Sequence, residues 1–195
     1  MSGFDLVFAL FGLVLGLAIA EVLAGFSRVL KMRGKAHVGW LTPLLGLVVL
    51  IDLTSFWSNA AELRDVLPGN LLTLIIVMLL VGAYYLIATL IFPANPDEWP
   101  DFDLYYDRFN RLLLGGMLAI NFASLIAGAT AFALAPEKPG KVDEALGLWS
   151  AVFELAPVPL LIALIVVKSR RWNVALMLIL IMDFLAMAVA EAIGG

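Results

Sequence analysis

The apolar run at positions 8–28, FALFGLVLGLAIAEVLAGFSR, constrains the fold more than any other feature of the sequence. It is long enough to cross a lipid bilayer, because about 20 apolar residues in a helix cover the hydrocarbon core. It contains one carboxylate, Glu21, and its only basic residue is Arg28 at the end. The preceding residues carry no positive charge, so we expect a reverse anchor with a translocated N-terminus and not a cleavable signal peptide.

Further segments of similar length and composition follow along the chain. The predicted spans cover residues 6–26, 38–57, 71–92, 112–135, 145–167 and 174–193. Each is far longer than a strand, and connections rich in Pro, Gly, Asp and Lys separate them. The chain is 63% hydrophobic, whereas soluble domains are usually about half apolar. We therefore predict an all-α integral membrane protein, a six-transmembrane-helix bundle that forms a single domain over residues 1–195.

The basic residues predict the orientation of the bundle. Most of the 12 Lys and Arg residues lie in the first, third and fifth connections: Arg28, Lys31, Arg33, Lys35, Arg108, Arg111, Lys168, Arg170 and Arg171. Cytoplasmic connections carry an excess of positive charge, so both termini are expected outside. The tryptophans near predicted helix ends are typical of interfacial anchors and support this topology.

A short internal similarity hints at a repeat. Residues 18–26, AIAEVLAGF, align with residues 121–129, NFASLIAGA. The two helices run in opposite directions in the predicted topology, so the repeat would be a 3+3 inverted one, as in many transporters. The alternative is a chance match between two segments that are both rich in Ala, Gly and Leu.

Composition excludes several classes of site. There are no cysteines, and His37 is the one histidine, so thiolate metal sites and bis-histidine haem ligation within one chain are excluded. Asp101 and Asp103 lack the third ligand position and turn glycine of a calcium loop. We interpret their connection as a solvated acidic segment, with a surface for a cytoplasmic partner and then a metal site as the alternatives. No metal or cofactor is predicted.

The sequence also lacks the signatures of the common enzyme classes. It contains no Gly-rich phosphate loop, HExxH or CxxC motif. No basic stripe interleaved with aromatic residues indicates nucleic-acid binding. We therefore predict that the protein is not an enzyme and binds no nucleic acid.

The carboxylates inside the predicted spans are the main functional signal. They are Glu21, Asp52, Glu154 and Asp183. A charge at the bilayer centre costs about 2.5–3.5 kcal/mol on insertion scales, so such groups face the bundle interior or a hydrated cavity. The deep parts of the spans contain no Lys or Arg. The acids are therefore expected to be protonated or neutralised by cations, which predicts an ion pathway.

Other polar residues share helical faces with these acids. The predicted hydrogen-bonding partners of the pathway are Ser55, Asn59, Asn121 and Ser124, and its outer mouth is predicted at Glu62 and Glu191. The alternative is that these groups hold the helices together without carrying ions. Gly12 and Gly16 are expected to form a seam between helices of one chain.

Two prolines interrupt the fifth predicted span. Pro157 and Pro159 follow Glu154 closely. Proline removes a backbone donor, so the helix should kink or break there. Freed carbonyls beside a carboxylate would form a cation or substrate site, since interrupted spans are common at transporter sites. The alternative is a kink without a ligand.

The segment LVLGLAIAEVLAGFSRVLKMR, residues 13–33, resembles the first helix of a group of uncharacterised small multi-pass proteins of the bacterial inner membrane. The pattern that carries the resemblance consists of Gly16, Glu21, Gly25 and Arg28. The resemblance implies a bacterial inner-membrane location and supplies no activity.

The carboxylates lead to one functional prediction and one alternative. We expect a channel or transporter for protons or small cations in the lipid bilayer. The alternative is a structural or accessory subunit of a membrane complex, or a lipid-binding membrane protein. A homo-oligomer or a membrane partner subunit is compatible with both.

Overall fold

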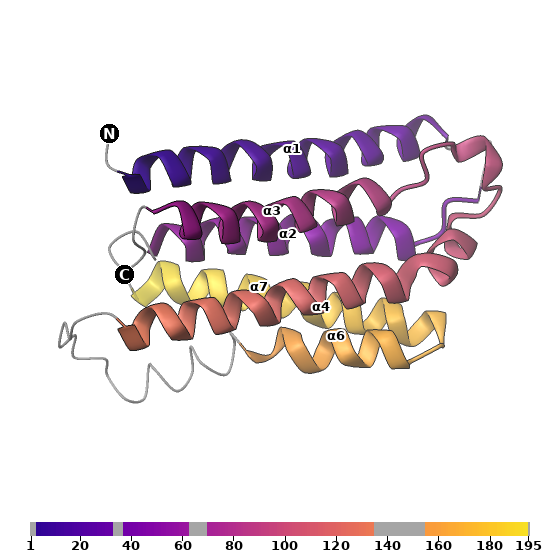
Figure 1. Ribbon diagram of the computed structural model, residues 1–195. Helices are drawn as coiled ribbons and strands as arrows, with labels where there is room; N and C mark the ends of the chain where they lie inside the picture. Colours follow the sequence, from indigo (N-terminus) through magenta and orange to yellow (C-terminus); the bar gives the residue numbers. More distant parts are fainter. Residues whose placement is uncertain (1–2, 33–36, 63–69, 135–154, 195) are drawn as a thin grey trace.

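The structure, a computed structural model, describes residues 3–32, 37–62, 70–134 and 155–194. Its helices are α1 (Gly3–Lys31), α2 (Leu41–Glu62), α3 (Leu71–Leu90), the short 3₁₀ helix η2 (Pro96–Glu98), α4 (Phe102–Leu134), α6 (Pro157–Val166) and α7 (Arg170–Gly194). Within these ranges there is one isolated bridge, between His37 and Asp101, and no strand. The long helices lie side by side, and successive ones run in opposite directions (Figure 1).

Five of these helices are long and apolar enough to cross a membrane. The qualifying segments are Val7–Lys31, Leu41–Ala61, Leu71–Leu90, Phe102–Ala127 and Arg170–Ala190. The all-α membrane class predicted from the sequence is therefore confirmed at this level. In its described part, α6 is a shorter apolar helix. The predicted fifth span begins within residues 135–154, outside the described residues, so a sixth span stays a prediction.

Several helix boundaries differ from the predicted spans. α3 begins at Leu71 as predicted, whereas α4 begins at Phe102 instead of residue 112. Asp101 explains this start, because its Oδ1 accepts a hydrogen bond from the backbone N–H of Asp103 at 2.8 Å. An aspartate in this position caps the first turn of a helix. Hydropathy alone did not indicate the part of α4 before residue 112, because this segment is rich in acids.

Among the remaining boundaries, α1 and α7 extend beyond the predicted spans, α2 begins and ends later than predicted, and α3 ends at Leu90 instead of residue 92. α1 covers Gly3–Lys31 where residues 6–26 were predicted, and α2 covers Leu41–Glu62 where residues 38–57 were predicted. α7 covers Arg170–Gly194 where residues 174–193 were predicted. Polar and charged residues at the helix ends lie outside a hydropathy window, although their backbone remains helical.

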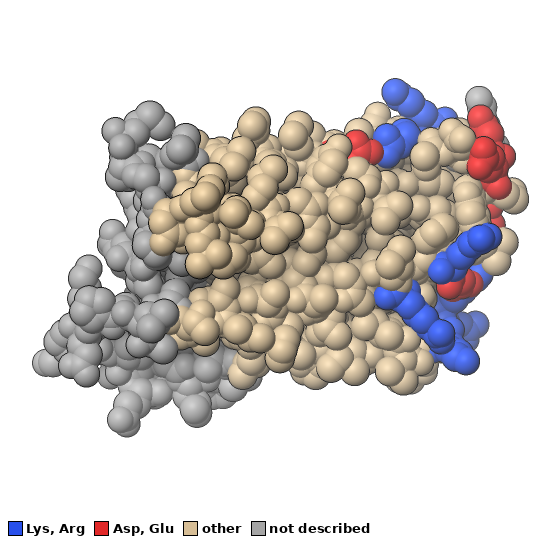
Figure 2. Space-filling model, viewed as in Figure 1, with Lys and Arg blue, Asp and Glu red and all other residues tan. Residues whose placement is uncertain are grey.

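The described surface is apolar over most of its length, and charge gathers at one end (Figure 2). The exposed large side chains include Leu13, Leu17, Leu72, Leu79, Leu86, Leu112 and Met182. A wide apolar surface of this kind is suited to lipid contact. Trp40 and Trp172 are exposed at the starts of α2 and α7, at the charged end, as expected for interfacial anchors.

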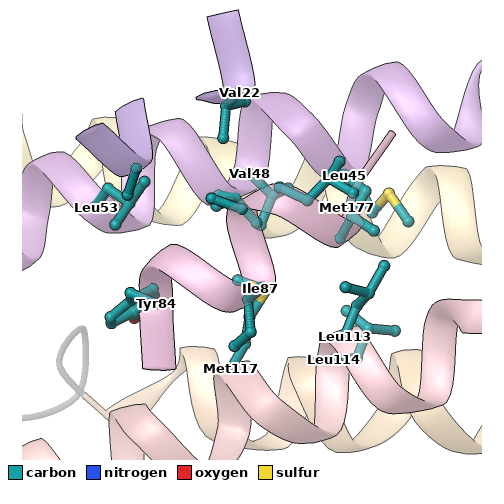
Figure 3. Close-up of a cluster of buried hydrophobic side chains, with 14 of the residues drawn as sticks. Val22, Leu45, Val48, Leu53, Tyr84, Ile87, Leu113, Leu114, Met117 and Met177 are labelled. Carbon is teal, nitrogen blue, oxygen red and sulfur yellow. The ribbon is translucent and has the colours of Figure 1, made fainter. Parts of the chain in front are cut away.

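The core consists of apolar side chains from all the long helices (Figure 3). α1 packs on α3 and α2, α2 packs on α7 and α4, and α4 packs on α3 and α6. Among the described helices α1 packs extensively on α3, whereas α4 packs on α6 more than on α7. The two halves therefore pack differently, and the 3+3 inverted repeat stays a prediction.

Two glycines allow close contact around the ring of Phe92. A Cβ atom added to Gly25 of α1 would overlap the ring, and one added to Gly46 of α2 would come within 2.9 Å of its Cζ. Phe26 packs against Phe92 edge to face, with ring centroids 5.1 Å apart. The ring therefore connects α1 and α2 with the chain that follows α3.

The two glycines of the predicted seam in α1 have different surroundings. A Cβ at Gly12 would lie 2.7 Å from Cη2 of Trp57, whereas Gly16 has nothing within 4 Å. Trp57 also packs against Phe8 and Phe11, with centroid distances of 5.5 and 5.9 Å. Gly12 therefore lies at a contact between two helices of one chain, as predicted, whereas Gly16 does not.

At the charged end, the connection before α2 pairs with the start of α4. The backbone N–H of His37 donates to the Pro100 carbonyl at 2.9 Å, and the N–H of Phe102 donates to the His37 carbonyl at 3.0 Å. Asp103 then accepts the N–H of Leu41 at the start of α2, at 3.3 Å. Gly39 has φ of +59°, and a Cβ there would overlap the Asp103 carboxylate. A side chain at position 39 would therefore displace this cap.

We expect Gly25→Ala to destabilise the protein and Gly16→Ala to leave its stability unchanged or slightly higher. The added methyl group at position 25 must displace the Phe92 ring, and overpacking of this kind costs about 1–3 kcal/mol. At Gly16 there is room, and alanine favours the helix by at most about 1 kcal/mol. Unfolding of both purified variants in detergent measures the difference. Equal stability of the two variants would contradict the contact with Phe92.

Candidate functional site

Asp52 is the predicted site residue that lies in the packed core. Its residue is 4% exposed, near the middle of α2. The hydroxyl of Tyr84, from α3, donates a hydrogen bond to Oδ2 of Asp52 at 2.6 Å, and Tyr84 is 0% exposed. A hydrogen bond to an ionised or strongly polar oxygen is stronger than one between neutral groups. This pair therefore links α2 and α3 inside the bundle.

Asn121 brings α4 into the same cluster. Its Nδ2 lies 3.1 Å from the Tyr84 hydroxyl oxygen and 3.3 Å from Oδ2 of Asp52. The same nitrogen donates to the carbonyl of Met117 one turn earlier, at 3.0 Å. We call the cluster of Asp52, Tyr84 and Asn121 the core polar site. Three helices supply one side chain each, so the site depends on their packing.

Apolar side chains enclose the core polar site. Leu53 and Val49 of α2 are fully buried beside Asp52, and the ring of Phe56 lies 5.1 Å from that of Tyr84. Tyr84 is one of the buried side chains of the hydrophobic cluster that Figure 3 shows. Apolar surroundings of this kind strengthen each polar contact.

The two carboxylate oxygens of Asp52 have different surroundings. The hydrogen bonds from Tyr84 and Asn121 both end on Oδ2. Oδ1 accepts no hydrogen bond from the described residues. Oδ1 is also not one of the fully buried unpaired polar atoms of the described residues, so it keeps some exposure and can exchange a proton with water. Oδ1 is therefore the atom of this site at which proton exchange is chemically reasonable.

Other predicted partners in α2 and α4 do not join this site. The Ser55 hydroxyl donates to the Ile51 carbonyl at 3.1 Å, and the Ser124 hydroxyl donates to the Ile120 carbonyl at 2.8 Å. Asn59 is exposed. The predicted polar stripe of α2 therefore does not stay in the interior beyond Asp52, toward the C-terminal end of the helix.

Glu21 has a counter-charge, contrary to the expectation that the acids within the spans lack one. Arg28, two turns further along α1, donates from Nη2 to Oε1 of Glu21 at 2.9 Å. Both side chains are about one-third exposed. The sequence interpretation failed here because it treated Arg28 as part of the connection, whereas α1 continues to Lys31.

Asp183 lies apart from the core polar site. It is partly exposed on α7 beside the buried Phe184, and it makes no hydrogen bond to the described residues. Glu154 lies outside the described residues, and the side chains of Glu62 and Glu191 are not described either. The structure therefore does not bring Glu21, Asp52 and Asp183 into one described cavity.

The sequence predicts a kink or break in the helix at the two prolines. In the described chain, a helix begins at this point. Pro157 is the first residue of α6, and Pro159 follows in the first turn. In the first turn of a helix the N–H group that proline lacks has no helical partner, so proline is tolerated there. The carbonyls beside Glu154 lie outside the described residues, so the predicted cation site is not tested.

Sequence reasoning missed Tyr84. It occurs in a predicted span that contains no charged residue and no side-chain amide. A phenol inside an apolar segment needs a hydrogen-bond partner when it is buried. That rule would have singled out Tyr84 as a partner for one of the acids, although the sequence does not indicate which one.

We expect Tyr84→Phe to destabilise the protein and Tyr85→Phe to have little effect. The first change removes the hydroxyl that donates to Asp52, and a buried group left without its partner costs about 1–3 kcal/mol. Tyr85 is partly exposed and makes no hydrogen bond to the described residues, so the same chemical change there is a matched control. Unfolding in detergent compares them. A Tyr84→Phe variant as stable as Tyr85→Phe would contradict the importance of this bond.

Comparisons with protein-family models, with curated proteins and with solved structures found no match for this chain. The functional interpretation therefore depends on the arrangement of its own residues. In the part of the chain that the structure describes, the core polar site is the cluster of polar side chains that joins three helices inside the bundle.

Proposed function

We propose that this protein is a membrane channel or transporter for protons, in which Asp52 binds and releases the proton. The single observation that carries this proposal is the buried Asp52 carboxylate, with Tyr84 and Asn121 on one oxygen and no described donor on the other. Ionisable groups inside membrane helices are costly and are common in proton relays and substrate pathways.

A proton suits this site better than a small metal cation. Na⁺ or Ca²⁺ requires several oxygen ligands around one point. The groups nearest to the Asp52 carboxylate instead present an O–H and an N–H donor to Oδ2. The amide of Asn121 also donates to the Tyr84 hydroxyl oxygen, which orients that hydroxyl toward Oδ2 of Asp52. The proton itself would be carried by the Asp52 carboxylate.

The proposal also includes the location, the number of spans, the repeat and the orientation predicted from the sequence. We place the chain in the bacterial inner membrane with six spans, an inverted repeat and both termini outside. The charged end supports this orientation, because basic residues in and beside the connections after α1, α3 and α6 gather there: Arg28, Lys31, Arg108, Lys168 and Arg170 (Figures 1 and 2). In this orientation Glu21 lies toward the cytoplasmic side of Asp52.

Proton flux into liposomes tests the proposal. We expect reconstituted wild-type protein to carry protons down an imposed pH gradient and Asp52→Asn to reduce the flux to that of protein-free vesicles. Asparagine keeps an oxygen that can accept the Tyr84 hydrogen bond, so the variant loses the titratable group and retains the contact. Asp97→Asn, at an exposed acid in η2, is the matched control and should keep the wild-type flux.

Two outcomes would contradict proton transport. One is a wild-type flux no greater than that of empty vesicles, and the other is an Asp52→Asn flux equal to that of wild type. Unfolding of the Asp52→Asn variant in detergent accompanies the assay, so that loss of flux is assigned only to folded protein.

A second candidate function is that of a structural or accessory subunit of a membrane complex. The observation that favours it is the dispersal of the acids: Glu21 pairs with Arg28, whereas Asp52 bonds to neighbouring helices. Polar contacts of this kind also stabilise helix packing without transport. In this case we expect a partner membrane protein to co-purify in mild detergent. A clean homo-oligomer without any partner would count against it.

A further inference from the structure

We propose that His37, Asp101 and Asp103 form a binding site for a divalent transition-metal ion, with Zn²⁺ the preferred one. The site lies at the charged end of the bundle, where the connection before α2 meets the start of α4. It is separate from the core polar site, and the inference does not depend on proton transport.

The ligand atoms of these three side chains converge. One atom from each lies within 4.8 Å of the other two. Nδ1 of His37 and Oδ1 of Asp101 are 3.3 Å apart. Ligands held at about 2.0–2.1 Å from a tetrahedral zinc ion lie roughly 3.3–3.4 Å from one another. The His37–Asp101 pair therefore already has the separation of two ligands on one ion, and a ligand atom of Asp103 lies within 4.8 Å of both.

Backbone contacts hold the ligands in place before any ion binds. The N–H and carbonyl of His37 pair with Pro100 and Phe102 on either side of Asp101. Asp101 is fixed further by the N–H of Asp103, and the Asp103 carboxylate is held over Gly39 by the N–H of Leu41. Residues distant in sequence are thus brought together by main-chain bonds, and a metal site gains affinity from such preorganisation.

The charges nearby are compatible with a bound cation. Burial acts to raise the pKa of Asp101, but the N–H of Asp103 and the His37 ring outweigh it and hold the pKa below its ordinary value. Arg170 also acts on Asp101 and Asp103, but its guanidinium is bound by Asp107 through both Nε and Nη2. The carboxylates of Asp101 and Asp103 therefore lie beside the exposed imidazole of His37, while the guanidinium of Arg170 is bound to Asp107.

A pocket gives the site an open side. It has a volume of about 470 Å³, and His37 and Asp103 lie on its wall together with Phe26, Val29, Trp40 and Pro43. An ion held by three protein ligands beside such a pocket would keep a position for water or for a further ligand, as open zinc sites do. The rest of the wall is mostly apolar, so it does not compete for the ion.

The donor set selects the class of metal. One imidazole nitrogen and two carboxylate oxygens suit Zn²⁺ and neighbouring transition ions, whereas Mg²⁺ and Ca²⁺ prefer oxygen ligands alone. The chain has a single histidine and no cysteine, so the imidazole ligand must be His37 and no thiolate competes. A signal from a metal-bound imidazole can therefore be assigned without ambiguity.

The test is a titration of the full-length protein in detergent with ZnCl₂, after chelator treatment and without a polyhistidine tag. We expect calorimetry to show one zinc ion per chain and weaker binding of MgCl₂. With ¹⁵N-labelled histidine, the imidazole resonances of His37 should shift as zinc is added. His37→Ala and Asp101→Asn should each weaken zinc binding by at least about tenfold.

The variants separate metal ligation from a change in the fold. The His37 side chain is 71% exposed and the pairing with α4 uses its main chain, so His37→Ala should fold normally. Asparagine at position 101 keeps the helix cap. Asp97→Asn, an exposed acid on the same connection, is the matched control and should bind zinc as wild type does. Equal affinity of wild type and His37→Ala, or no zinc binding by wild type, would overturn the proposal and leave His37 and Asp101 as a hydrogen-bonded pair only.

Discussion

The hydrogen bond from Tyr84 to Asp52 is the buried polar contact that joins α2 to α3, and Asn121 extends it to α4. The outside of this bundle is nearly as apolar as its inside, so hydrophobicity alone does not decide which face of a helix turns inward. A carboxylate in the middle of α2 does decide this, because it must meet donors from other helices. Tyr84 and Asn121 supply them, and the rotation of α2 relative to α3 and α4 follows.

Much of the fold could be predicted from the sequence because its signals are local. Runs of apolar residues indicate helices wherever they are long enough, and α3 begins at Leu71 as the run predicts. The gathering of Lys and Arg at one end follows from alternating helix directions. Boundaries were less accurate where charge continues along a helix, as at the end of α1 and at the start of α4.

The site could be predicted only in part, because its contacts join distant residues. Asp52 and Asn121 were recognisable as polar groups within apolar segments, but the sequence does not show that they meet. Tyr84 gave no signal beyond its presence in an uncharged span. The pairing of His37 with Asp101 is less accessible still, since it depends on two connections that come together only when the helices pack.

The ring of Phe92 has a mechanical consequence for the bundle. It sits between Gly25 of α1 and Gly46 of α2, where neither helix has a side chain that could yield. Any tilt of these helices relative to each other must therefore turn about this ring. Asp52 lies roughly 9 Å from Gly46 along α2, and the start of the helix at Leu41 lies roughly 7.5 Å away on the other side, at about 1.5 Å per residue. A tilt about the ring would therefore move the core polar site and the charged end by similar distances in opposite directions.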